Sequence, residues 1–181
     1  MIVQISDTAY RGNGVGRTAD GKAVFVPYTV TGDEIRIEIV EDKGSYAIGE
    51  LKEIIKPSDW RAEAHCPHHG SCGGCHFGHI RYDKQLEIKR NIVLQALRKH
   101  PQQALIAEKL KVFSAKPLGY RIRANVRMMD GKAGFYKANS HDFIPVKNCP
   151  VIASSLWEKC HNFAVNCNSG SLAVMKNTEG L

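Results

Sequence analysis

Long hydrophobic runs are missing from this sequence, and so are the marks of a secreted protein. No stretch approaches the ~18 consecutive apolar residues that a membrane span needs. The first residues, MIVQISDTAYRGNG, lack both the basic start and the apolar core of a signal peptide. The sequence therefore predicts a cytoplasmic protein that has no membrane partner. It also lacks internal repeats and low-complexity segments, and its ordinary composition excludes a disordered or collagen-like chain.

Acidic residues are scarce in the second part of the chain. Residues 1–58 carry 7 basic and 9 acidic residues, for a net charge of −2, whereas residues 59–181 carry 18 and 9, for a net charge of +9. A surplus confined to one part suggests that this part meets a polyanion such as a nucleic acid. A solvated basic surface without a partner has the same composition, so charge alone does not decide between the two readings.

The first 58 residues predict a small β-barrel. Residues 23–26, 35–40 and 46–55 are rich in strand-forming side chains, and turn sequences separate them. These turns are Asp20-Gly21, Thr31-Gly32-Asp33 and Lys43-Gly44-Ser45. Short strands with closely spaced turns are typical of an OB-like barrel, here of five strands. The GNGVG segment at 12–16 lacks the third glycine and the following helix of a phosphate-binding loop, so we expect it to bend a barrel strand.

Residues 59–181 predict a small α+β domain after a linker at Pro57-Ser58-Asp59. An apolar stripe at helical spacing predicts a helix over 82–99, and a second helix is expected over 153–166. The expected strands lie at 110–114, 120–129, 132–137, 142–147 and 171–176. Asp130-Gly131 is a strong hairpin turn between two of them. The sequence stops just after the last expected strand, which suggests a piece of a longer protein.

Clustered cysteines give the strongest chemical signal. In a chain that has no signal peptide and is long enough to build a core, such cysteines bind metal more often than they form disulfides. Three of the six lie in HCPHHGSCGGCHFGH at 65–79, where Cys66, Cys72 and Cys75 form a C-x5-C-x2-C motif. The two-residue gap lets two thiolates reach one centre, and the glycines between them let amide N–H groups turn toward sulfur.

A fourth ligand must come from elsewhere, and Cys149, after an expected strand, is the best candidate. Four thiolates suit either structural zinc or an iron–sulfur cluster. The five-residue gap and the missing second close pair favour the cluster, but spacing alone leaves both open. Cys160 and Cys167, in and just after the second helix, are expected to pack in the core. The loop also offers histidines as ligands, most of which are expected to face solvent or pack: His65, His68, His69, His76 and His79.

Further motifs follow the cysteine loop in a fixed order. They are Tyr82-Asp83-Lys84-Gln85-Leu86, Tyr120-Arg121-Ile122-Arg123, Gly134-Phe135-Tyr136, Ser140-His141 and Asn148-Cys149-Pro150-Val151. With the cysteine loop they resemble the iron–sulfur-containing RNA uracil-5-methyltransferases, which make 5-methyluridine in 23S rRNA. Residues 1–58 resemble the TRAM domain of that family, an OB-like RNA-binding barrel. The resemblance implies that Cys66, Cys72, Cys75 and Cys149 hold a [4Fe–4S] cluster. The family usually has glutamines where this chain has His76-Phe77-Gly78, a departure that touches no ligand.

The resemblance does not extend to the family's methyl-transfer domain. That domain binds S-adenosylmethionine and carries a catalytic cysteine and an acidic general base, which have no counterpart before Leu181. We therefore expect the RNA-recognition and iron–sulfur portion of an RNA uridine C5-methyltransferase, inactive by itself, with rRNA rather than tRNA as its partner. The alternative is a stand-alone nucleic-acid module that binds zinc or an iron–sulfur cluster. The sequence assigns no oligomeric state.

Candidate RNA contacts follow from strand periodicity. Arg121, Arg123 and Arg127 alternate along one expected strand and so share a face, with Tyr120 and Phe135 nearby in sequence. Such a face suits phosphates and stacked bases, although a solvated face with salt bridges has the same pattern. In the barrel, the candidates are Arg17, Lys43, Tyr46 and Lys52, and on the first helix they are Lys84, Lys89 and Arg90.

Overall fold

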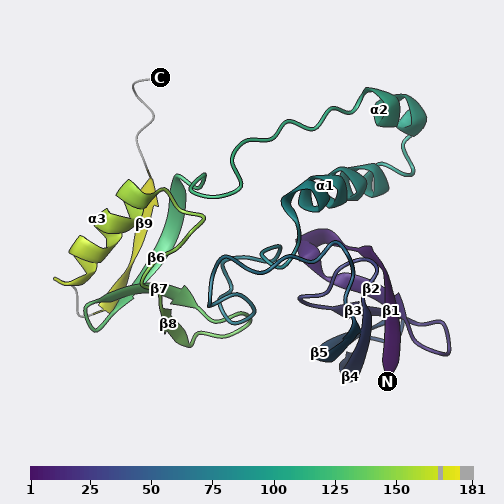
Figure 1. The fold of residues 1–181 in the computed structure, drawn as a ribbon, viewed down its shortest axis with the longest axis horizontal. Coiled ribbons are helices and arrows are strands. Elements are labelled where there is room, and N and C mark those ends of the chain that lie inside the picture. Colours follow the sequence, from purple (N-terminus) through teal and green to yellow (C-terminus); the bar gives the residue numbers. More distant parts are fainter. Residues whose placement is uncertain (167–168, 176–181) are drawn as a thin grey trace. The chain divides into compact units, whose positions relative to one another are not determined.

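The computed structural model describes residues 1–166 and 169–175, which form two compact units (Figure 1). The barrel unit comprises residues 1–64 and 76–114, and the sheet unit comprises residues 65–75 and the chain from 115 onward. Cys167 lies outside the described residues. Within these residues, no helix is both long and apolar enough to cross a membrane. The domain boundary expected near residue 58 stays a prediction.

Five strands close into a barrel in the order β1-β2-β3-β5-β4, which confirms the expected N-terminal fold. They are β1 (Ile2–Thr8), β2 (Gly14–Arg17), β3 (Ala23–Val26), β4 (Glu34–Asp42) and β5 (Tyr46–Lys56). Alternate side chains point inward, so the barrel interior is a cluster of small and branched residues. Its buried members are Val3, Ile5, Val24, Val26, Ile35, Ile37 and Ala47.

The glycines at 12–16 allow the first two strands to pack closely. A Cβ atom on Gly14 would lie 2.0 Å from the Thr29 Oγ1 atom, and one on Gly16 would lie 2.3 Å from the Val3 Cγ1 atom. Strand β2 follows a short 3₁₀ turn, Tyr10–Gly12, and no helix follows β2. These glycines therefore shape the barrel wall, as expected, and pairing of β1 with β2 shifts register between Ile5 and Asp7.

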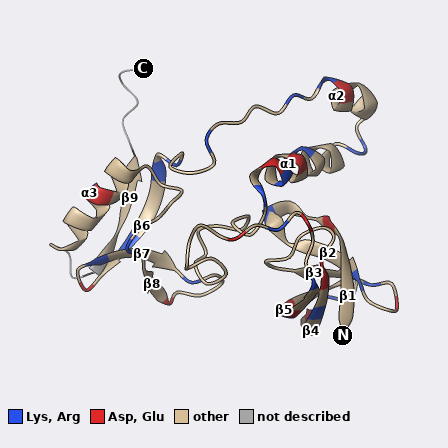
Figure 2. Ribbon diagram, viewed as in Figure 1, with Lys and Arg blue, Asp and Glu red and all other residues tan. Residues whose placement is uncertain are grey.

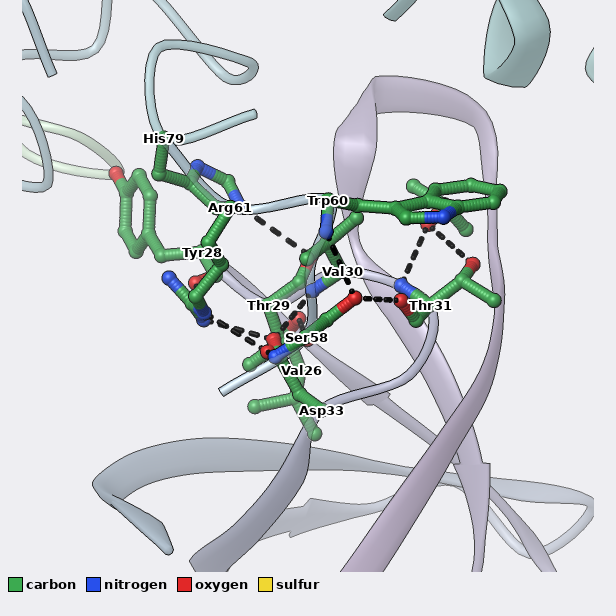
Figure 3. Close-up of polar contacts among 11 residues, drawn as sticks. Val26, Tyr28, Thr29, Val30, Thr31, Asp33, Ser58, Trp60, Arg61 and His79 are labelled. Atoms are coloured by element: carbon green, nitrogen blue, oxygen red, sulfur yellow. Dashed lines mark hydrogen bonds and ion pairs between the residues drawn. The ribbon is translucent and has the colours of Figure 1, made fainter. Parts of the chain in front are cut away.

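A buried polar network closes one end of the barrel (Figure 3). The Asp33 carboxylate is fully buried and accepts four hydrogen bonds, two on each oxygen. Its Oδ1 atom accepts from the Ser58 N–H at 3.0 Å and the Arg61 Nε–H at 2.8 Å. Its Oδ2 atom accepts from the Val30 N–H and from an Arg61 guanidinium nitrogen, both at 2.8 Å. The Asp33 side chain thus ties the β3–β4 connection to the residues that follow β5.

Helix α1 (Tyr82–Ala96) belongs to the barrel unit and packs there mainly through Ile88, whereas Val93 of its expected apolar stripe is exposed. Ile88 of this helix is 3% exposed and joins Val30 and Ile80 in a small buried cluster, against which Trp60 and Phe77 also pack. The nearly buried His79 side chain reaches the same region, with its Nε2 atom 3.3 Å from the Thr29 carbonyl oxygen. The helix ends at Ala96, three residues before the expected end at residue 99.

The chain after α1 departs from the expectation in two ways. Residues 103–109 form a short helix, α2 (Gln103–Lys109), where none was expected. The strand expected at 110–114 is wrong, because these residues form no strand in the described structure. Apolar side chains alternate there, but no neighbouring strand satisfies the backbone hydrogen bonds, and Phe113 is 88% exposed.

The sheet unit has a four-stranded antiparallel sheet in the order β8-β7-β6-β9. Its elements are β6 (Arg123–Met129), β7 (Lys132–Tyr136), β8 (Phe143–Pro145), α3 (Ser154–Ala164) and β9 (Ser169–Met175). Asp130 and Gly131 have φ values of 50° and 71°, as a primed hairpin turn requires, which confirms the turn expected between β6 and β7. Helix α3 packs on one face of the sheet through Trp157 and Cys160, so the expectation that Cys160 packs in the core is confirmed.

Candidate functional site

The cysteine loop is fastened to the end of strand β7 by backbone hydrogen bonds. The Gly73 N–H donates to the Tyr136 carbonyl at 3.0 Å, and the Ala138 N–H donates to the Ser71 carbonyl at 2.8 Å. Cys72 forms an isolated β-bridge with Lys137 between these two bonds. These bonds fix the loop that carries Cys66, Cys72 and Cys75 beside the end of β7.

Cys149 lies on a second backbone segment of the same unit. Residues 149–152 run beside residues 119–121, because the Gly119 N–H donates to the Pro150 carbonyl at 2.9 Å and the Arg121 N–H donates to the Val151 carbonyl at 2.8 Å. The Arg121 guanidinium also donates to the Gly74 carbonyl at 3.3 Å. Arg121 therefore holds the Cys149 segment and the Cys72-Gly73-Gly74-Cys75 turn together.

The thiols of the loop and of Cys149 act electrostatically on one another. Burial is the main cause that raises the pKa of the Cys72 and Cys149 thiols, and it raises the pKa of Cys75 to about 11. Cys66 raises the pKa of all three thiols further, and Cys149 does the same for Cys72 and Cys75. The positive charge of Arg121 lowers all three pKa values. The four thiols are therefore near enough to influence one another, and burial disfavours the thiolate forms of Cys72, Cys75 and Cys149 unless a positive charge compensates them.

Deprotonated cysteine thiols are ligands for zinc and for iron–sulfur clusters, so this region contains donor groups of a suitable kind. Cys66, Cys72, Cys75 and Cys149 are all free of disulfides. The Gly74 N–H points at the Cys72 Sγ atom at 3.4 Å, the kind of N–H to sulfur contact that the glycine pair predicted. Among the described residues, however, no group of three or more His, Cys, Asp or Glu side chains is drawn close enough to hold a single metal ion.

Among the described residues of the sheet unit, α3 covers one face of the sheet and no helix covers the other, which we call the open face; the arginines of β6 lie on this open face. Alternation along β6 buries Ala124, Val126 and Met128 toward α3, so Arg123 and Arg127 point the other way. The Cζ atom of Arg127 lies 4.6 Å from the centroid of the Tyr136 ring. Figure 2 marks these basic residues along β6.

Three sequence candidates lie elsewhere than on this open face. Phe135 stacks on Trp157, with ring centroids 5.7 Å apart and planes at 14°, so it belongs to the covered side. Arg121 precedes β6 and serves the cysteine loop, and Tyr120, which is 52% exposed, precedes it in the chain. Sequence reasoning missed Tyr136, the residue next to Phe135. Pairing of Arg127 with Gly134, two residues before Tyr136, places Tyr136 on the open face.

The barrel candidates are engaged by neighbouring groups. Arg17 donates to the Gly21 carbonyl at 2.8 Å, and Tyr46 packs edge-on against Phe25 with centroids 5.4 Å apart. Lys43 forms a salt bridge with Glu41, and Lys52 bridges Glu50 at 2.6 Å and Glu38 at 3.0 Å. Exposed salt bridges of this kind are weak, so they would not prevent these side chains from turning to a bound RNA.

Known proteins match this chain at two levels, as a domain family over the barrel and as longer relatives over most of the chain. Residues 1–52 match the family model of the TRAM domain. The chain is 34% identical over 162 residues to the 23S rRNA (uracil(1939)-C(5))-methyltransferase RlmD of Vibrio parahaemolyticus, a match that covers 86% of this chain and 36% of that protein. It is 36% identical over 154 residues to an uncharacterized RNA methyltransferase of Nostoc, covering 82% and 33%. The chain thus spans about a third of the length of these relatives.

A solved structure shares the fold. The tRNA (uracil-54, C5)-methyltransferase of Pyrococcus abyssi, in complex with S-adenosyl-L-homocysteine, superposes with a TM-score of 0.55. The sequence identity is 23%, and the match covers 87% of this chain and 36% of that one. At this identity the likeness supports the fold alone.

Proposed function

Because this chain carries an N-terminal TRAM domain and is homologous to the N-terminal third of RNA uracil-C5 methyltransferases, we propose that it is the part of such an enzyme that binds RNA and an iron–sulfur cluster. The observation that carries this proposal is the match over 162 residues, which covers 86% of this chain and so extends far beyond the barrel. The relatives extend well beyond the matched region, and we assign methyl transfer from S-adenosylmethionine to that remainder. The 181 residues alone should then transfer no methyl group.

The residues of the sheet unit fit a [4Fe–4S] cluster in their donor chemistry. Such a cluster takes four cysteine thiolates, and Cys66, Cys72, Cys75 and Cys149 are four free thiols that lie near enough to influence one another. The cluster with its thiolates carries a net charge of about −2, which the nearby Arg121 guanidinium would offset. When bound, it would cross-link the loop at 66–75 to the segment after β8. Its proposed role is structural, because it would add a cross-link between two segments that the hydrogen bond from Arg121 to the Gly74 carbonyl already brings near each other.

The RNA surface that we propose in the sheet unit is the open face of the sheet. Arg123, Asn125 and Arg127 alternate along β6, and Tyr136 of β7 lies beneath the Arg127 guanidinium. RNA bases stack on aromatic rings and on guanidinium planes, and arginines also bind phosphates. The Tyr136 ring has the His141 ring edge-on at 5.4 Å, so its position is fixed on that side. The face therefore offers a stacking platform that is bordered by cations.

We expect Arg127→Ala and Tyr136→Ala to weaken RNA binding by the 181-residue chain. Loss of a stacking ring costs about 1–3 kcal/mol per base, and loss of one phosphate contact lowers the slope of log K against log salt by about 0.7 for single strands. Fluorescence anisotropy with a labelled 23S rRNA fragment, titrated at several salt concentrations, measures both effects. Lys159→Ala is the matched control, because Lys159 is exposed on α3, on the covered side. Equal weakening by the control would count against the open face.

The RNA partner is tested with the same assay. We expect the chain to bind a 23S rRNA transcript more tightly than a tRNA transcript, and to incorporate no label from methyl-labelled S-adenosylmethionine into either. Incorporation of methyl groups by this chain would overturn the proposal that methyl transfer belongs to the remainder of the relatives. Equal affinity for both transcripts would remove the preference for rRNA.

A further inference from the structure

The loop between β1 and β2 presents an aromatic ring and a guanidinium at the surface of the barrel unit. Tyr10 is 75% exposed, and the exposed Arg11 has its Cζ atom 6.0 Å from the centroid of the Tyr10 ring. Arg11 has a φ of 68°, in the left-handed region that residues other than Gly, Asn and Asp seldom adopt. Strained conformations of this kind cluster at ligand sites, so this loop is a candidate for function.

Gly12 packs this loop against the start of the segment that leads to α1. A Cβ atom on Gly12 would lie 3.1 Å from the His76 carbonyl oxygen and 3.3 Å from the Phe77 Cε2 atom. The ammonium group of Lys89, on α1, lies 5.8 Å from the centroid of the same Phe77 ring. His76 and Lys89 are both exposed. The β1–β2 loop, the His76-Phe77 segment and α1 are far apart in sequence, and they come together at Phe77.

The charges of this patch are not neutralised by neighbours. Within the described part of the chain, neither Arg11 nor Lys89 forms a salt bridge. On α1, Glu87 pairs with Lys84 at 2.7 Å. Asp7 of β1 accepts a hydrogen bond from the neutral Gln95 amide at 2.6 Å and keeps its negative charge. Asp83 pairs with Arg81 at 3.0 Å. Arg11 and Lys89 therefore keep positive charges that an anionic ligand can meet, although the barrel sequence as a whole is slightly acidic.

We propose that this β1–β2 patch, defined by Tyr10, Arg11, His76 and Lys89, binds an unpaired nucleotide of single-stranded RNA. The base stacks on the exposed Tyr10 ring, and Arg11 and Lys89 bind the flanking phosphates. Exposed aromatic rings with cations nearby are typical of sites that bind single-stranded nucleic acids without base-specific hydrogen bonds. The proposal rests on RNA binding by this chain, but it adds a contact in the barrel unit that is independent of the sheet face and of the cysteines.

The test uses the complete 181-residue chain and an oligouridylate of about 12 nucleotides, a length within the usual site size of OB folds. Tyr10→Ala should weaken binding about tenfold, whereas Tyr10→Phe, which keeps the ring, should bind like the parent. Arg11→Asn removes the charge with a residue that tolerates the left-handed backbone, and Lys89→Gln removes the second charge. Together these two changes should lower the salt slope by about 1.4. Lys56→Gln, which removes an exposed charge from β5 in the same unit, is the control for net charge.

The outcomes separate this proposal from the function on which it rests. If the parent chain binds RNA and Arg127→Ala weakens that binding, but Tyr10→Ala equals Tyr10→Phe, the β1–β2 patch is overturned and the proposed function stands. If the parent chain binds no RNA, the proposed function itself falls. Unfolding curves of each variant check that the barrel is intact. A duplex of the same length should be insensitive to Tyr10→Ala, because paired bases have no free face to stack, and equal sensitivity would contradict the assignment to unpaired nucleotides.

Discussion

Replacing Asp33 by asparagine should destabilise the barrel unit by about 3–5 kcal/mol, the usual cost of removing one partner from a buried ion pair. Each carboxylate oxygen of Asp33 accepts two N–H donors, and no part of the side chain is exposed. An asparagine must place its own NH₂ group opposite two of these donors, whichever way the amide is turned. It would also leave the Arg61 guanidinium, whose side chain is only 18% exposed, without its countercharge.

Urea unfolding followed by tryptophan fluorescence measures this loss. The chain has two tryptophans, Trp60 in the barrel unit and Trp157 in the sheet unit. A Trp157→Phe background therefore leaves Trp60 as the reporter of the barrel unit. The matched control is Asp42→Asn, which removes an exposed aspartate that pairs with Lys22 at 2.7 Å and should change the midpoint little. A midpoint for Asp33→Asn that equals the control would contradict the anchoring role of this carboxylate.

Replacing Cys149 by serine should release the iron of the chain and lower the stability of the sheet unit. The proposed cluster joins Cys75 to Cys149 across a loop of about 75 residues, and a cross-link of that span is worth about 4 kcal/mol by loop-closure entropy. Iron counted after anaerobic purification should fall from about four per chain toward zero. Unfolding of the sheet unit, followed by Trp157 in a Trp60→Phe background, should move to lower urea concentration.

Cys160→Ala is the control for this experiment, because Cys160 is fully buried between α3 and the sheet and is not part of the cysteine loop. It should keep the iron content of the parent chain, although it costs some stability through the small cavity that it leaves. Loss of iron from Cys149→Ser without any shift in unfolding would refute the structural role of the cluster. Full retention of iron would show that Cys149 is not a ligand.

Much of the barrel could be predicted because its determinants are local. Ile35 and Ile37 alternate with charged residues in β4, and glycine turns separate the strands, so each strand is visible in its own residues. The role of Asp33 could not be predicted in this way. Thr31-Gly32-Asp33 is typical of a turn, and only the fold brings Ser58 and Arg61 to its carboxylate.

The sequence alone also could not show on which face of the sheet each side chain lies, because this depends on where α3 packs. Phe135 and Tyr136 are adjacent, so they point to opposite faces, and the choice between them depends on which face α3 covers. Arg121 shares the strand periodicity of Arg123 and Arg127, but it precedes β6 and its guanidinium turns to the Gly74 carbonyl. The strand expected at 110–114 was wrong for a related reason. Alternating apolar residues suggest a strand, but they do not show whether the fold supplies a partner strand to pair with it.

The most direct test of this account is the ultraviolet–visible spectrum of anaerobically purified chain, with iron, sulfide and zinc counted and with chemical reconstitution by iron and sulfide if the colour is absent. We expect a broad absorption near about 400 nm and about four irons and four sulfides per chain, lost in Cys149→Ser. A colourless protein that contains one zinc, or that takes up no iron and sulfide on reconstitution, would contradict the cluster assignment.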